Sequence, residues 1–182
     1  MRKALMALVV LLPFLALTLP AQAAAQGVYI GAGMNFPTSD YKDYHDNGFL
    51  GVAGVSFPLG MEALSVYGEG LWGRNAINDE NDAVTNPYGV MGGLLYDFAE
   101  EDSPGFYVFG QAGLMVHKYS SDEYGDESDS GFGFGGGAGF GYPMDGMGFW
   151  VEGRYLSASI DNSTTAFMAV MAGISVYLGG ND

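Results

Sequence analysis

The chain has 182 residues, with 21 acidic and six basic side chains and a formal net charge of −15. So acidic a chain has no electrostatic basis for binding nucleic acid. The absence of cysteine excludes a disulfide framework and any thiolate metal site. Glycine, with 30 residues, and aromatic side chains, with 26, are abundant; this composition disfavours helices and is typical of β-barrels.

The first 23 residues have the pattern of a bacterial secretory signal peptide. Arg2 and Lys3 precede an apolar run over residues 4–19, and Ala21-Gln22-Ala23 is a small-x-small cleavage site. A second register permits cleavage after Ala25. We therefore expect export through the Sec pathway.

Removal of residues 1–23 leaves one mature domain over 24–182, with 21 acidic and four basic side chains and a net charge of −17. No later apolar run is long enough for a helix of about 20 residues to span a bilayer. Any membrane crossing by the mature domain is therefore expected to use β-strands.

Eight β-strands are predicted, because side-chain character alternates with a period of two along the mature domain. The expected strands are residues 27–36, 48–57, 64–74, 87–97, 105–117, 131–142, 149–156 and 166–178.

The predicted connections alternate in length. Pro37 is expected to end the first strand, and Pro58-Leu59-Gly60 to begin a short turn after the second. The longest loop is expected over residues 118–130, which hold five carboxylates. Polar connections follow the odd-numbered strands and short ones follow the even-numbered strands, as in outer membrane barrels with long outer loops and short periplasmic turns.

The orientation of the faces favours a membrane barrel. In the last predicted strand, which is expected to pair with the first, the face from Met168 to Leu178 is wholly apolar and the other face is mixed. Elsewhere, Glu69 and Gln111 lie opposite faces rich in large apolar groups. A soluble ligand-carrying barrel would reverse this arrangement. The predicted fold is an all-β, eight-stranded, antiparallel, up-and-down transmembrane β-barrel, with a soluble sandwich or lipocalin-like barrel as the alternative.

Two segments resemble strands of a known family. Val28-Tyr29-Ile30-Gly31-Ala32-Gly33 and Phe106-Tyr107-Val108-Phe109-Gly110-Gln111-Ala112-Gly113 resemble strands of the eight-stranded outer membrane β-barrel family, which includes opacity-type adhesins and the barrel of outer membrane protein A. Trp150-Val151-Glu152-Gly153-Arg154-Tyr155 is similar to the penultimate strand of that family. The resemblance covers the whole mature chain. It departs at the end, where Gly179-Gly180-Asn181-Asp182 follows the aromatic position that such proteins usually end on.

Catalytic and metal-binding patterns are weak. The two histidines are His45, in the first expected loop, and His117, at the end of the fifth strand; each is interpreted as a loop-edge residue rather than part of a lipid A-modifying site. The acidic runs 78–82 and 126–131 carry oxygen ligands of the kind that Ca²⁺ prefers. Neither has the twelve-residue loop pattern with its terminal Glu, so we predict no metal site, no cofactor and no enzyme activity.

Three charged residues are expected inside the barrel. Glu69, Glu152 and Arg154 face inward by parity, and the third and seventh strands lie across an eight-stranded barrel from each other. Charges away from bulk water need partners, and Arg offers five donors to two carboxylates. The resemblance likewise implies an acid–arginine network here, so we predict a structural lumen network.

The predicted function is a structural or surface-interaction role in the bacterial outer membrane. Eight strands leave room only for side chains inside, so the lumen is expected to be filled, with Tyr29, Tyr107, Phe109, Trp150 and Tyr177 contributing. A narrow channel for small or apolar solutes is the alternative. The expected partners are outer membrane lipid, lipopolysaccharide and the barrel assembly machinery.

Overall fold

The structure, a computed structural model, describes residues 26–61, 63–77, 83–100, 103–121, 125–160 and 163–178. The predicted signal peptide and the end of the chain after Leu178 lie outside these residues. So does the acidic run 78–82. The only described helix is a 3₁₀ segment of five residues, η1, and no described helix is long and apolar enough to cross a membrane.

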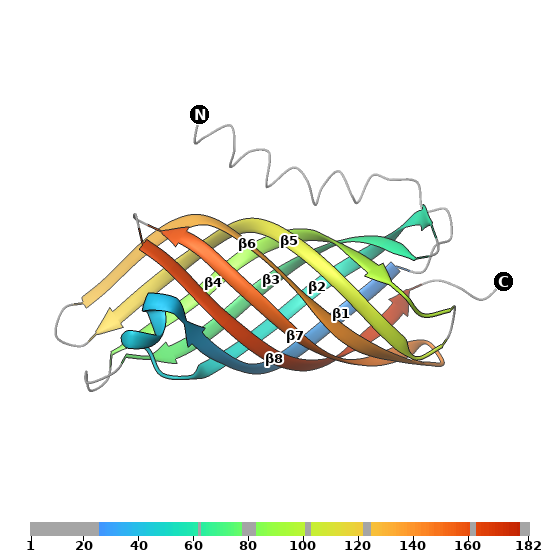
Figure 1. The fold of residues 1–182 in the computed structure, drawn as a ribbon, viewed down its shortest axis with the longest axis horizontal. Helices are drawn as coiled ribbons and strands as arrows, with labels where there is room; N and C mark the ends of the chain where they lie inside the picture. Colours follow the sequence, from blue (N-terminus) through green and yellow to red (C-terminus); the bar gives the residue numbers. More distant parts are fainter. Residues whose placement is uncertain are drawn as a thin grey trace, which may run out of the picture.

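Eight strands and η1 make up the fold (Figure 1). Their bounds are β1 Gln26–Thr38, η1 Ser39–Asp43, β2 Gly48–Met61, β3 Leu64–Ala76, β4 Val84–Asp97, β5 Gly105–Ser121, β6 Gly125–Met144, β7 Met147–Ile160 and β8 Ser163–Leu178.

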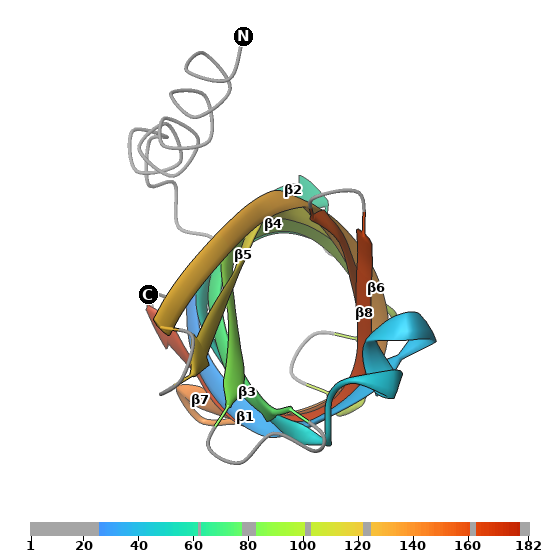
Figure 2. The same ribbon diagram turned by 90° about the vertical axis from the view of Figure 1, so that its left-hand side faces the viewer.

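The sheet closes on itself in chain order. Each strand pairs antiparallel with the next, and β1 pairs with β8 from Gln26↔Leu178 to Thr38↔Ala166. Figure 2 shows the resulting barrel nearly end-on, with η1 at one rim. The start of β1 and the end of β8 lie at the opposite end from η1 (Figure 1). The predicted closed, eight-stranded, antiparallel up-and-down barrel is confirmed.

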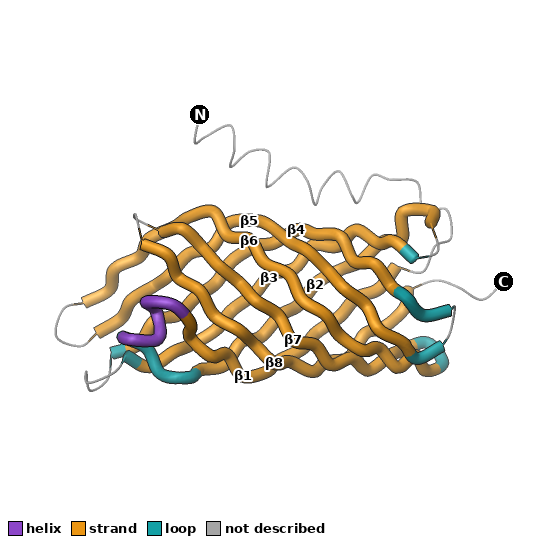
Figure 3. Tube along the Cα trace, in the orientation of Figure 1, coloured by secondary structure: helices purple, strands orange, loops and turns teal. Residues whose placement is uncertain are grey.

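The strands are longer than predicted (Figure 3). β1 continues through Pro37 to Thr38, and β2 continues through Pro58 to Met61. Proline is tolerated where its missing N–H is not needed by the ladder or where the register is irregular, and the β2–β3 register shifts between Pro58 and Met61. The predicted stops at these prolines were therefore wrong.

The predicted long loop over 118–130 is also wrong for its described residues. β5 runs to Ser121 and β6 begins at Gly125, paired in register from Ser121↔Gly125 to Gly105↔Gly141. This extended hairpin reaches further than its neighbours at the left end of Figure 1. On its other side, β6 pairs with β7 only from Phe132 onward. The acidic residues thus stand on paired strands rather than on a loop.

The outer surface is apolar between two groups of aromatic residues. Six aromatic residues of the outer face are between 39% and 68% exposed: Trp72, Tyr88, Tyr96, Phe106, Phe149 and Tyr155. Trp72 packs against Phe49 with ring centroids 4.8 Å apart towards one end, and Phe106 packs against Phe140 at 5.2 Å towards the other. Tyr88 and Tyr96 are eight positions apart on β4, about 27 Å along the strand. This spacing suits the roughly 25 Å apolar band of outer membrane barrels, once strand tilt is considered.

Buried side chains line the inside of the barrel. One cluster joins buried side chains from six of the strands, including Leu50, Tyr67, Met91, Phe109 and Trp150. Over residues 131–141 the inward positions of β6 are glycines, and two of them make space for rings from β5. A Cβ at Gly139 would overlap the Tyr107 ring, and one at Gly137 would come within 2.7 Å of Phe109.

Two of the expected lumen-filling residues, Tyr29 and Tyr177, are less buried than the other three. Tyr107, Phe109 and Trp150 are each less than 10% exposed and belong to the core cluster, whereas Tyr29 packs against it while only partly buried. Tyr177 is 43% exposed. It pairs with Gly27 at the extreme end of the β1–β8 ladder, and a residue at that level lies at the barrel mouth rather than in the packed interior.

Candidate functional site: a charged lumen network and a mouth cavity

The lumen brings together Arg154 from β7 with Glu69 from β3 and Glu152 from β7. Arg154 Nη1 donates to Glu69 Oε1 at 2.6 Å, and Arg154 Nε donates to Glu152 Oε1 at 2.7 Å. Arg154 Nη2 completes ion pairs to both carboxylates. All three residues are at most 7% exposed. The two carboxylates share one guanidinium, so the group carries one net negative charge.

Tyrosines hold the outer oxygens of both carboxylates. Tyr29 donates to Glu69 Oε2 at 3.1 Å, and Tyr107 donates to Glu152 Oε2 at 2.9 Å. The Phe109 ring lies 5.3 Å from the guanidinium carbon, a cation–π geometry. Each carboxylate therefore accepts hydrogen bonds from both Arg and Tyr, as a buried charge requires.

A second polar cluster, at the η1 end, is one that the sequence reasoning missed. Asn35 on β1 and Asn75 on β3 are fully buried, and each side-chain amide donates to the other, at 3.1 and 2.6 Å. The Asn35 oxygen also accepts from the Gly48 N–H, and Asn75 donates to the Asp46 carbonyl. The cluster fastens the chain where it re-enters the barrel as β2. The sequence signal for this cluster was parity. Asn35 lies on the same face of β1 as Tyr29, and Asn75 lies on the same face of β3 as Glu69.

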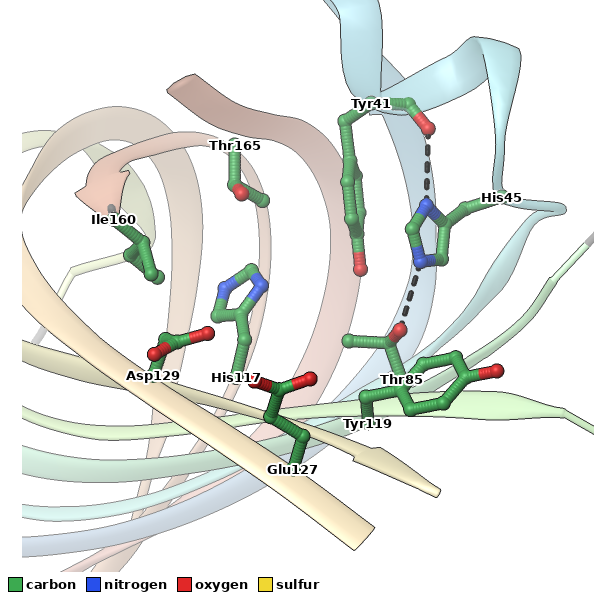
Figure 4. Close-up of a pocket in the computed structure, with 9 residues that line it drawn as sticks. All are labelled: Tyr41, His45, Thr85, His117, Tyr119, Glu127, Asp129, Ile160 and Thr165. Atoms are coloured by element: carbon green, nitrogen blue, oxygen red, sulfur yellow. Dashed lines mark hydrogen bonds between the residues drawn. The ribbon is translucent and has the colours of Figure 1, made fainter. Parts of the chain in front are cut away.

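Beyond this cluster the barrel end is hollowed into a cavity of about 320 Å³. Figure 4 shows its lining, contributed by η1, the following turn, and the ends of β4 to β8: Tyr41, His45, Thr85, His117, Tyr119, Glu127, Asp129, Ile160 and Thr165.

Both histidines lie in this cavity rather than at exposed loop edges. His45 Nδ1 lies 3.2 Å from the Tyr41 carbonyl oxygen, and Nε2 lies 2.8 Å from Thr85 Oγ1. A carbonyl only accepts, so the neutral ring donates from Nδ1 and accepts at Nε2. The ring stacks on Tyr41 with centroids 3.9 Å apart. Burial lowers the pKa of His45 below its usual 6.5, and the Tyr41 carbonyl opposes this shift.

His117 stands on the inner face of β5, directly opposite Asp129 on β6. Its Nε2 is buried without a hydrogen-bond partner, and so is Tyr41 Oη. Asp126, on the opposite face of β6, points outward and forms an ion pair with Lys118 at 2.6 Å. The run 126–131 thus divides its carboxylates between two faces of a strand. Among the described residues no group of three or more His, Asp or Glu is placed to hold a metal ion.

The chain forms a closed, eight-stranded barrel with an apolar exterior, two aromatic groups and interior charges. This is the architecture of a bacterial outer membrane barrel. A sequence model of the outer membrane protein beta-barrel domain matches residues 9–177. The chain belongs to this family, and its expected membership of the outer membrane barrels is confirmed. No curated protein matches its sequence significantly.

Solved structures show the same fold at low sequence identity. Neisserial surface protein A superposes with a TM-score of 0.70 at 15% identity, covering 85% of this chain and 99% of that one. Ail, the attachment invasion locus protein of Yersinia pestis, gives 0.55 at 19% identity with the same coverages. The N-terminal β-barrel domain of Pseudomonas aeruginosa OprF gives 0.51 at 14% identity, covering 85% and 100%.

Proposed function

We propose that the protein is a closed structural and surface-presenting barrel of the outer membrane, without enzyme activity and without solute passage. The observation that carries the proposal is the interior. Glu69, Glu152 and Arg154 meet across the lumen within hydrogen-bonding distance, and the core cluster packs against them. Two inward glycines of β6, Gly137 and Gly139, face the rings of Phe109 and Tyr107 on β5.

The same proposal covers the location and the partners of the protein. The protein is exported by the Sec pathway, folded by the barrel assembly machinery and embedded in outer membrane lipid. The extended β5–β6 hairpin stands beyond the apolar band, where divalent cations could bridge its exposed carboxylates to anionic lipopolysaccharide. The intact mass of the mature protein tests export, because a chain beginning at Ala24 or at Gln26 supports the signal peptide and one beginning at Met1 contradicts it.

The absence of catalysis is supported by the mouth cavity. Its nine lining residues include neither Ser nor Cys, and both ring nitrogens of His45 are engaged. The hydroxyl that donates to His45 Nε2 is that of Thr85, and the other ring nitrogen meets a backbone carbonyl rather than a carboxylate. The Ser–His–acid set of acyl-transfer enzymes is therefore not assembled among these residues.

Planar bilayers test closure. Purified wild-type protein should give no stable conductance steps. A Phe109→Ala, Trp150→Ala double variant, which removes two core rings, serves as the positive control and should give openings if it folds. Stable, reproducible steps from the wild type would contradict the closed barrel and favour the narrow channel for small solutes.

A further inference from the structure

The mouth cavity combines unpaired acidic groups with unpartnered polar atoms. Glu127 and Asp129 stand two residues apart on the inner face of β6, and both side chains are exposed to the cavity. No Lys or Arg is among the nine lining residues. Lys118, on the neighbouring strand β5, faces outward and is paired to Asp126. The two inner carboxylates therefore have no basic partner in the lining.

Two buried atoms in the same lining lack hydrogen bonds. Tyr41 is 7% exposed, and its Oη has no partner. Figure 4 shows this hydroxyl pointing into the cavity, between the His117 ring and the Thr85 side chain. His117 Nε2 is the second such atom. Buried polar groups in native structures almost always find a partner, either in the protein, in water or in a ligand.

The geometry points to a binding site for a primary ammonium group, carried by a small organic amine whose chain leaves through the open mouth. An ammonium presents three N–H donors and no acceptor. Glu127 and Asp129 supply the negative charge that such a group needs. His117 Nε2 and Tyr41 Oη are acceptors without hydrogen-bond partners in the same lining. The rings of Tyr41 and Tyr119 flank the same space, and aromatic faces attract cations.

A metal ion fits the cavity less well. His45 uses both ring nitrogens within the protein, which leaves His117 as the one imidazole available. Zinc sites take four ligands in tetrahedral geometry, and the described residues contain no group of three placed for a metal. An anionic ligand is disfavoured because it would meet two carboxylates and no cation.

Binding of putrescine to the full-length mature protein in nanodiscs tests the proposal, by isothermal titration calorimetry and by the imidazole nitrogen NMR signals of His117. We expect saturable binding with a shift at His117 Nε2. Tetramethylammonium is the matched probe, because it is a cation without N–H donors and should bind at least tenfold more weakly.

The variants Glu127→Gln and Asp129→Asn keep the side-chain shape and remove the charge. Each should weaken putrescine binding by roughly tenfold or more, since hydrogen bonds to charged groups are the stronger class. Asp126→Asn, on the outer face of the same strand, is the control and should bind as the wild type does. Heat-dependent migration in detergent gels confirms that each variant is folded.

Three results would overturn the inference. The first is that Asp126→Asn weakens putrescine binding as much as the inner-face variants do, which would indicate general attraction to an acidic surface. The second is that tetramethylammonium binds as tightly as putrescine. The third is that putrescine gives no saturable binding signal. Tight 1:1 binding of Zn²⁺ alone that Asp129→Asn abolishes, without putrescine binding, would assign the cavity to a metal instead.

Discussion

At the residue scale, Arg154 determines whether two interior carboxylates are paired. Arg154→Ala leaves Glu69 and Glu152 with only one tyrosine hydroxyl each, and breaking such a buried ion pair typically costs about 3–5 kcal/mol. We expect the temperature at which the folded gel band disappears to fall well below that of the wild type.

Asp126→Ala is the control for this variant. Its carboxylate also forms an ion pair, with Lys118, but both partners are largely exposed, and exposed pairs contribute little. The band should persist to nearly the wild-type temperature. Equal, small decreases in both variants would show that the lumen network does not stabilise the barrel.

His45 gives the mouth a dependence on pH. Its pKa is lowered mainly by burial, so the folded mouth favours the neutral ring. The stabilisation from this preference is complete above the unfolded pKa of about 6.5, and it is lost as the pH falls below that value. Titration by NMR should show the ring signals of Tyr41, which stacks on His45, moving with the His45 transition at a pH below 6.5. A His45 transition at or above 6.5 would contradict this expectation.

At the residue level, the sequence signal for the lumen was the parity of each position along its strand. Charged residues with inward parity have few places to find partners, so Glu69 and Arg154 could be named together before their geometry was known. The mouth cavity could not, because it depends on how η1 and the turn after it fold back over the rim. Nothing in the alternation of β5 indicates that Tyr41 and His45 will face His117.

At the element scale, β6 depends on glycine for its fit against β5. Gly139→Ala would place a methyl group into the Tyr107 ring, whose hydroxyl also holds Glu152. Overpacking of this kind typically costs about 1–3 kcal/mol. Gly141→Ala is a matched control on the same strand and face, since a Cβ there meets nothing within 4 Å. Gly139→Ala should lower the gel transition temperature, and Gly141→Ala should leave it almost unchanged. Similar behaviour of the two variants would contradict the packing argument.

Strand ends were the least predictable part of each element. The two-residue period predicted which face meets lipid in most strands, because that face must be apolar along the whole crossing. In residues 48–57 both faces carry apolar residues and glycine, so the period did not decide. Beyond the apolar band both faces meet water, and the period vanishes. Residues 125–130, rich in Asp, Ser and Glu, then have the composition of a loop. Only their pairing with β5 makes them a strand.

At the scale of the whole molecule, the orientation of the barrel in the membrane can be tested with cysteine labelling, because the chain has no native cysteine. Asp126→Cys stands on the extended hairpin, and Glu100→Cys stands in the connection between β4 and β5 at the opposite end. A membrane-impermeant maleimide added to intact cells should label Asp126→Cys at once, and Glu100→Cys only after the outer membrane is permeabilised. The reverse order would reject the proposed topology.

The projecting part of β6 has a consequence for how the protein behaves among its own copies. Residues 125–131 pair with β5 but not with β7, so one backbone edge of an otherwise closed sheet is open to strand addition. Two molecules meeting there would set Asp126, Glu127 and Asp129 against the same residues of the other copy, and like charges on an edge discourage pairing. We therefore expect the mutual repulsion of these carboxylates to keep the barrels apart. The triple variant Asp126→Asn, Glu127→Gln, Asp129→Asn removes all three charges. In detergent solution it should form dimers that a cross-linker can trap, under conditions in which the wild type stays monomeric. A monomeric triple variant would show that charge does not protect this edge.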